Sequence, residues 1–149
     1  MTLENEINQR EFKSDYHKLV VSILFTGNWM FQKQSNIIKK YGLTLQQYNI
    51  LRILKGQYPE PATINLLIER MLDKMSNASR IVDRLEKKNY VSRFICKKDR
   101  RTVDVLITDK GLELLNEINK CEEKTENKFT TLSKSEIKIL NNLLDKLRG

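Results

Sequence analysis

Hydrophobic residues recur every three or four positions along residues 16–38. This spacing places them on one face of an α-helix, so the pattern predicts a long amphipathic helix here. The stripe consists of Tyr16, Leu19, Val20, Ile23, Gly27, Met30, Phe31, Ile37 and Ile38. Gly42 is expected to end the helix, because glycine adopts the left-handed conformation of a helix terminus at little cost.

Polar capping residues predict where three further helices begin. Thr44 stands three residues before Gln47, and this pair forms a capping box at the start of a second helix. Thr63 is expected to cap a short third helix. Asp73 is expected to cap a fourth, running from Lys74 to Lys88, with only a tight turn before it.

The hydrophobic period changes from helical to alternating after residue 90. Asn89 stands where the preceding helix must turn left-handed, which asparagine tolerates better than most residues. Residues 91–96 are rich in β-formers, and apolar and polar residues alternate along residues 102–107. Together they predict a β-hairpin whose tip, residues 97–101, is basic.

Two more helices complete the chain. Thr108 is expected to cap the first, whose inner face would carry Leu112, Leu115 and Ile118. Ser133 and Glu136 form a capping box for the last helix. Its apolar stripe consists of Ile137, Leu140, Leu143, Leu144 and Leu147. Because one small domain cannot easily cover apolar faces at both ends of the chain, we expect the terminal helices to pair between two copies.

This order of elements predicts a mainly α fold with a small β-hairpin wing. It corresponds to a winged helix-turn-helix with a terminal-helix dimerisation region. Residues 1–42 would form the N-terminal dimerisation region, residues 43–108 the winged helix-turn-helix lobe, and residues 109–149 the C-terminal dimerisation helices, all within one compact chain.

The charge of the chain favours a polyanionic partner. Its 149 residues carry 27 Lys and Arg against 19 Asp and Glu, for a formal charge of +8. Residues 73–101 alone hold ten basic and four acidic residues, and 10 − 4 = +6 is most of that total. The concentration of charge on one helix and the hairpin favours double-stranded DNA as the partner.

Other classes of function find little support. The sequence has no Gly-rich phosphate loop and only one histidine, so we expect neither an enzyme, nor a metal site, nor a cofactor. Cys96 and Cys121 form no CxxC pair and are interpreted as packing residues in a reducing compartment. No signal peptide or membrane span is recognisable, so we expect a cytoplasmic bacterial protein that joins the nucleoid when bound to DNA.

The basic segment offers two kinds of DNA contact. Side chains in the first turns of the helix predicted for residues 74–88 can reach base edges in the major groove: Ser76, Asn77, Ser79 and Arg80. Cations farther along are suited to phosphates: Arg84, Lys87, Lys88, Arg93 and Lys98. At the hairpin tip, Asp99, Arg100 and Arg101 are predicted to contact a minor groove, with Arg101 inserted and Asp99 holding it extended.

Three segments of the chain resemble the MarR family of transcriptional regulators. They are residues 80–91 (RIVDRLEKKNYV), 98–101 (KDRR) and 106–111 (LITDKG), and the likeness extends over nearly the whole chain. The resemblance implies a homodimer that binds a pseudo-palindromic operator. It also implies repression of nearby genes, relieved by a small aromatic or phenolic effector or by oxidation.

The sequence departs from the family pattern at several positions. Asn89 replaces a frequent glycine, and the short third helix has larger side chains at residues 66–68 where alanine is usual. Related oxidation sensors carry a cysteine near the start of the first long helix, where this chain has Tyr16 and His17. Thiol sensing by that route is therefore not expected.

A pocket and two alternative functions complete the predictions. Tyr16, His17 and Tyr48 are candidate residues for an effector pocket beneath the first long helix, although aromatic residues at helical spacing are core residues by default. The alternatives to a sequence-specific regulator are a winged-helix protein-interaction module and an unspecific nucleic-acid-binding protein. Whether affinity depends on duplex sequence separates them.

Overall fold

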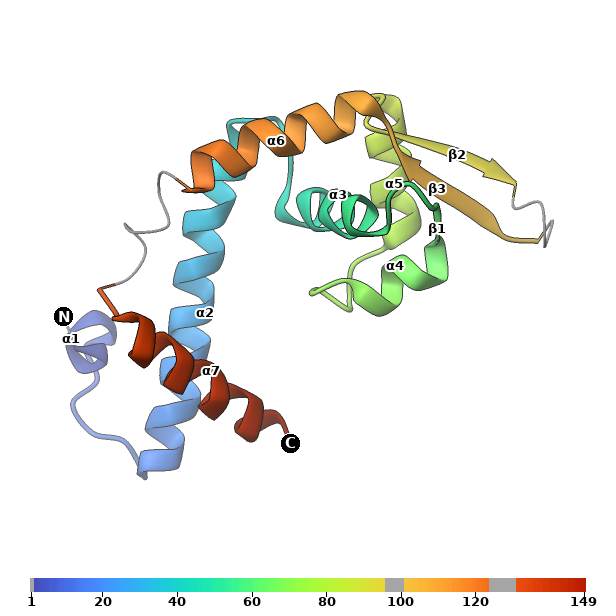
Figure 1. Cartoon of the computed structure of the whole chain (residues 1–149). Helices are drawn as coiled ribbons and strands as arrows, with labels where there is room; N and C mark the ends of the chain where they lie inside the picture. The colour runs from blue at the N-terminus through green and yellow to red at the C-terminus, as the bar shows by residue number, and fades with distance from the viewer. Residues whose placement is uncertain (1, 96–100, 124–130) are drawn as a thin grey trace.

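The computed structural model of the protein describes residues 2–95, 101–123 and 131–149. The elements run in the order α1 (Leu3–Ile7), α2 (Asp15–Lys39), α3 (Leu45–Gln57), β1 (Ala62–Thr63), α4 (Ile64–Arg70), α5 (Ala78–Lys87), β2 (Val91–Ile95), β3 (Val103–Ile107), α6 (Asp109–Glu123) and α7 (Lys134–Arg148). The mainly α fold with a hairpin wing is thereby confirmed. The wing projects from one side of a helical lobe, and the first half of α2 extends away from that lobe (Figure 1).

The predicted helix boundaries hold at three positions in the first half of the chain. Gly42 has a φ of +69°, so the left-handed turn after α2 falls on the residue that permits it. Thr44 and Gln47 form both hydrogen bonds of the capping box that begins α3. The hydroxyl of Thr63 accepts from the amide of Leu66 at the start of α4. Helix α1 was not predicted, because its five residues lack an apolar periodicity.

The start of α5 differs from the prediction. The helix begins at Ala78 rather than at Lys74, and its N-cap is Asn77. Asp73 instead closes a separate turn, in which its carboxylate accepts from the amide of Met75 and the hydroxyl of Ser76. The sequence pattern did not locate the start of α5, because Asp73 and Asn77 are both favourable N-cap residues. The packing of Ala78 against the core selects the later one.

The wing belongs to a three-stranded antiparallel sheet with the order β1-β3-β2. The hairpin of β2 and β3 is confirmed, and Val91 pairs with Ile107 at its base. The third strand, β1, was not predicted, because its two residues are too few to show alternation. Asn89 adopts a φ of +61° between α5 and β2, as the sequence indicated.

Gly111, in the first turn of α6, is fixed by close packing rather than by an unusual backbone angle. A Cβ at this position would lie 2.4 Å from the carbonyl oxygen of Tyr90 and 2.8 Å from Cγ1 of Ile107. The helix therefore approaches the base of the hairpin to a distance that only glycine permits. This contact ties the orientation of α6 to that of the wing.

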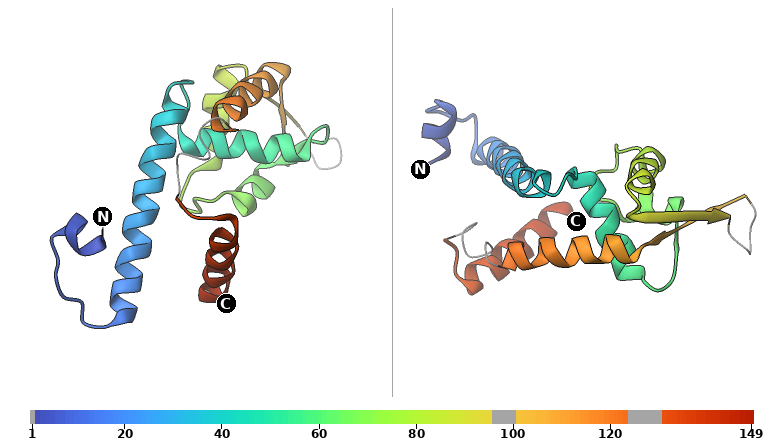
Figure 2. Two further views of the ribbon diagram at one scale, coloured as in Figure 1. Left: turned by 60° about the vertical axis from the view of Figure 1, so that its left-hand side comes forward. Right: turned by 90° about the horizontal axis from the view of Figure 1, so that it is seen from above.

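The core is centred on α3. Buried side chains of α3, α5, β3 and α6 meet there, including Ile50, Leu51, Val82, Leu115 and Ile118. By contrast, Ile38 is the buried residue of α2, and α7 has none. The two views in Figure 2 show α7 and the N-terminal half of α2 extending beyond the lobe.

Replacing Asn77 by alanine is expected to destabilise the protein by about 1 kcal/mol, because the amide of Arg80 loses its capping oxygen. Chemical denaturation monitored by circular dichroism measures this change in the free energy of unfolding. Asn77→Ser, which keeps a capping oxygen, is the matched control and should stay close to the wild type. An alanine variant as stable as the serine variant would show that Asn77 is not the cap.

Candidate nucleic-acid interface

Helix α5 presents three distinct faces. Ala78, Val82 and Leu85 are buried and hold the helix against the core. Asp83 and Glu86, three residues apart and therefore neighbours on the helix surface, face strand β2. The third face is exposed and basic, and it carries Arg80, Arg84 and Lys87.

The charges of the basic face are available to a ligand. Within the described part of the chain, the side chains of Arg80, Arg84 and Lys87 make no hydrogen bond or ion pair. Their spacing of four and three residues aligns them along one edge of the helix. Three unpaired cations in such a row form an electrostatic footprint suited to a run of phosphates or base acceptors.

The residues just before α5 form a structured turn. The carboxylate of Asp73 lies 2.6 Å from the Ser76 hydroxyl and 3.0 Å from the Met75 amide. Hydrogen bonds from Ser76, Met75 and Gln46, in decreasing order of effect, lower the pKa of Asp73. Because the depressed pKa favours the ionised form, this turn is stable at neutral pH and weakens only as the pH falls through that lowered pKa.

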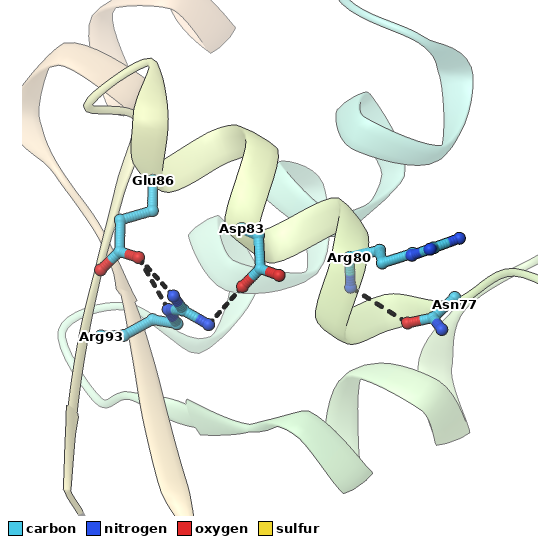
Figure 3. A network of polar contacts seen from close by, with 5 residues as sticks. All are labelled: Asn77, Arg80, Asp83, Glu86 and Arg93. Carbon is cyan, nitrogen blue, oxygen red and sulfur yellow. Dashed lines mark hydrogen bonds and ion pairs between the residues drawn. The ribbon is translucent and has the colours of Figure 1, made fainter.

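The prediction that Ser76 and Asn77 lie in the first turns of the helix is wrong. Ser76 belongs to the Asp73 turn, and Asn77 is the N-cap, whose side-chain oxygen accepts from the amide of Arg80 at 3.0 Å. Ser79 and Arg80 do lie in the first turn of α5. All four residues remain together at one end of the helix, and Figure 3 shows the Arg80 guanidinium pointing outwards beside Asn77.

Arg93 on strand β2 was predicted to contact a phosphate, but its guanidinium is already bound within the chain. Its Nε donates to Oε2 of Glu86 at 2.8 Å, and Nη1 forms an ion pair with Asp83 (Figure 3). The hydrogen bond with Glu86, followed by the charges of Glu86 and Asp83, raises the pKa of Arg93. Sequence reasoning missed the two acidic partners, whose i, i+3 spacing opposite a strand arginine was the available signal.

The remaining predicted phosphate and wing residues fall into two groups. Lys88 donates through Nζ to the carbonyl of Gly42, so it also ties α5 to the turn after α2. Arg101 is exposed two residues before the start of β3. Lys98, Asp99 and Arg100, like Cys96, lie outside the described residues.

A cavity of about 860 Å³ opens between α2, α3 and the segment that leads into α5. Apolar side chains form much of its wall, together with a few polar groups. Its lining residues are Met30, Phe31, Gln34, Ile37, Leu45, Gln46, Tyr48, Asn49, Arg52, Ile53, Leu72 and Asp73.

The predicted pocket residues are only partly brought together. Tyr48 lines the cavity, and its hydroxyl accepts from Arg52 at 3.1 Å. Tyr16 and His17 do not line it, because they lie at the other end of α2, where His17 packs against the edge of Phe12. The apolar stripe from Tyr16 to Ile38 spans about six helical turns, and the sequence gave no means of deciding which turn faces a cavity.

Within residues 2–95, 101–123 and 131–149, no group of three or more His, Cys, Asp or Glu side chains is arranged to hold a metal ion. None of the helices described by the structure is both long and apolar enough to cross a membrane.

The sequence and the fold were compared with known proteins. The model of the MarR family matches residues 43–103, which span the lobe from α3 to the first residue of β3. The transcriptional regulator MgrA of Staphylococcus aureus is 28% identical over 140 residues, which cover 90% of this chain and 92% of MgrA.

Solved structures share the same architecture. A MarR-like transcription regulator from Bacillus cereus ATCC 10987 superposes with a TM-score of 0.78 at 21% identity, covering 90% of this chain and 96% of that one. The S. aureus MepR protein in its complex with DNA superposes with a TM-score of 0.74 at 20% identity, covering 92% and 96%. The family match and the relative, which is named a transcriptional regulator, agree with the resemblance seen in the sequence. Residues 43–103 of the chain are thus a MarR-family domain.

Proposed function

We propose that this protein is a transcriptional regulator that binds double-stranded DNA in a sequence-specific manner. The observation that carries the proposal is the exposed face of α5, on which Arg80, Arg84 and Lys87 are aligned without partners among the described residues. A helix of this kind fits the major groove, and the adjoining hairpin reaches the flanking minor groove. The MepR–DNA complex, which shares the fold, supports this assignment.

The residues at the start of α5 read base edges in this proposal. The side-chain oxygen of Asn77 is occupied by the Arg80 amide, so its NH2 group remains to donate to an acceptor on a base. Ser76 and Ser79 supply hydroxyls, and the Arg80 guanidinium can donate two hydrogen bonds to guanine. These four residues would therefore specify the sequence.

Cations farther along α5 and the wing position the protein on the duplex. Arg84 and Lys87 contact phosphates, and Lys98 would add a phosphate contact from the wing. Arg101 enters the minor groove, where negative potential is concentrated at narrow A·T-rich stretches, assisted by Asp99 and Arg100. Lys88, the C-cap of α5, holds the C-terminal end of this helix through its hydrogen bond to the carbonyl of Gly42.

Arg84→Ala is expected to flatten the dependence of log K on log salt by about 0.9, because one phosphate contact fewer releases fewer counterions. Arg101→Ala should weaken binding most at operators with A·T-rich flanks. Fluorescence anisotropy at several salt concentrations, on a labelled duplex from upstream of the coding sequence and on its scrambled version, measures both effects.

Lys120→Ala is the matched control, because it removes an equal charge from an exposed position. Lys120 lies in the last turn of α6, at the end of this helix that is far from the wing. Equal affinity for the upstream and scrambled duplexes would indicate an unspecific DNA-binding protein. Absence of binding to either would contradict the proposal and favour a protein-interaction module.

The functional unit in this proposal is a homodimer in which residues 1–42 and 109–149 meet those of a second copy. Large apolar side chains are exposed along both regions, including Leu24 and Phe31 on α2 and Leu140 and Leu143 on α7. Contiguous exposed apolar surface of this kind marks an association surface. A two-fold dimer would present two α5 helices to successive major grooves, about 34 Å apart, of a pseudo-palindromic operator.

Leu143→Glu is expected to shift the protein from dimer to monomer, because a carboxylate would be buried without a partner in the proposed interface. Sedimentation equilibrium measures the mass in solution. Asn142→Glu introduces the same charge on the opposite side of α7 and should leave the dimer intact. A wild type that sediments as a monomer would contradict the homodimer.

We also propose that the protein is a repressor released by a small aromatic effector bound in the cavity. The cavity is large enough for such a ligand, and Arg52 offers a cation beside the Tyr48 hydroxyl to an acidic oxygen. Helix α3 holds the segment before α5, since Asn49 accepts from the Leu72 amide and Gln46 donates to Asp73. A ligand that competes for these groups would change the position of α5.

Benzoate is expected to raise the melting temperature of the protein. It should also weaken binding to the upstream duplex, and the duplex should weaken the binding of benzoate by the same factor. Differential scanning fluorimetry and anisotropy with added benzoate measure the two effects, with benzyl alcohol as the uncharged probe. Arg52→Met should remove the preference for benzoate, whereas Arg70→Met, a change of the same kind at a residue that does not line the cavity, should not. If benzoate leaves both quantities unchanged, the cavity does not bind aromatic acids.

A further inference from the structure

The ion pairs of Arg93 connect the two elements that the proposed function places in different grooves of DNA. Asp83 and Glu86 belong to α5, and Arg93 belongs to the strand that leads out to the wing. Figure 3 shows the guanidinium reaching both carboxylates, towards the end of α5 opposite to Asn77 and Arg80. We define Asp83, Glu86 and Arg93 as the wing clamp.

The geometry of the wing clamp is that of a two-point attachment. Nε and Nη2 of Arg93 both reach Oε2 of Glu86, at 2.8 and 2.6 Å, while Nη1 reaches Asp83. A planar guanidinium held by carboxylates one helical turn apart cannot rotate without breaking one of the contacts. The angle between the strand and the helix is thereby restrained at a point outside the hydrophobic core.

The two strands of the wing are held differently: β3 is paired with β1 and buries Val105 opposite Arg93, whereas β2 is exposed beyond its base. Within β2, Val91 is buried at the base of the hairpin, whereas Ser92, Arg93, Phe94 and Ile95 are exposed. In β2, full burial is therefore confined to the first residue of the strand. Among the described residues, the ion pairs that join β2 to α5 are those of the wing clamp.

The charges of the wing clamp make its role testable. A pair of acidic residues beside a DNA-binding surface repels phosphate, so electrostatics alone predicts that their removal would strengthen DNA binding. Their side chains retain 44% and 38% of their exposure, and Arg93 retains 32%, so the ion pairs contribute little to folding stability. The presence of Asp83 and Glu86 beside the DNA-binding surface therefore points to a role other than binding phosphate or stabilising the fold.

From these observations we infer that Asp83, Glu86 and Arg93 are positioning residues that hold the wing at the angle required for α5 and Arg101 to bind DNA together. Arg93 accordingly acts through the two carboxylates rather than through a phosphate. This inference rests on the proposed DNA-binding function and deepens it. It makes two acidic side chains necessary to the binding of a polyanion.

The test is DNA binding by the double variant D83N/E86Q, in the full-length protein and on the same upstream duplex. The wing clamp predicts that affinity falls about threefold to fivefold although two negative charges have been removed. It also predicts that Arg101→Ala weakens binding less in the D83N/E86Q background than in the wild type, because a wing that has lost its angle has already lost part of the minor-groove contact.

A charge exchange provides the rescue. Glu86→Arg and Arg93→Glu each break the attachment, whereas E86R/R93E restores an ion pair between the same two positions and should recover affinity relative to either single variant. Circular dichroism melting of each variant establishes that it is folded, and exposed ion pairs predict only small changes in melting temperature.

Binding by D83N/E86Q that is tighter than or equal to that of the wild type would overturn the inference, as would Arg101→Ala effects that are the same in both backgrounds. A salt slope for Arg93→Gln that falls by about 0.9, with unchanged binding by D83N/E86Q, would show that Arg93 is a phosphate contact. Failure of the proposed function is distinguishable from all of these, because the wild type itself would then not bind the duplex.

Discussion

Burial of helix α3 is the constraint on which the other elements depend. Ile50 and Leu51 are fully buried, and the helix contacts α2, α4, α5, α6 and β3. Because each neighbour packs on a different part of the same helix, the orientation of α5 relative to the sheet is fixed by the side chains of α3. The exposed face of α5 is what remains once its apolar residues have met that core.

Ten residues of α5 thereby serve three purposes without conflict. The helical period places Val82 and Leu85 inwards, Asp83 and Glu86 towards β2, and Arg84 and Lys87 outwards. Because each residue of an α-helix is rotated by about 100° from the one before it, these three sets occupy adjacent sectors around the helix. The acidic residues that dilute the charge of the helix are those that fix its angle to the wing.

The segment between α4 and α5 links the cavity to the proposed DNA-binding face. It is held from α3 through Asn49 and Gln46, and its own turn is closed by Asp73. These are exposed hydrogen bonds that contribute little net stability, so the segment can change position at small energetic cost. A change there reaches α5 directly, since Asn77 caps the helix only four residues after Asp73.

The sequence by itself determined the features that depend on neighbouring residues. Capping boxes at Thr44 and Ser133, the left-handed turns at Gly42 and Asn89, and the hairpin of β2 and β3 are set by local hydrogen bonds and by the repeat of apolar positions. For the same reason the candidate residues Ser79, Arg80, Arg84 and Lys87 could be assigned to one helix.

Only the tertiary structure decided the features that depend on residues far apart in the chain. Asp73 and Asn77 are equivalent caps locally, and burial of Ala78 selects between them. Strand β1 exists because β3 provides its partner, and the cavity excludes Tyr16 and His17 because α3 meets only the far end of α2. Arg93 was read as a free cation because its acidic partners lie seven and ten residues away, and only the packing of β2 beside α5 brings their opposite charges together.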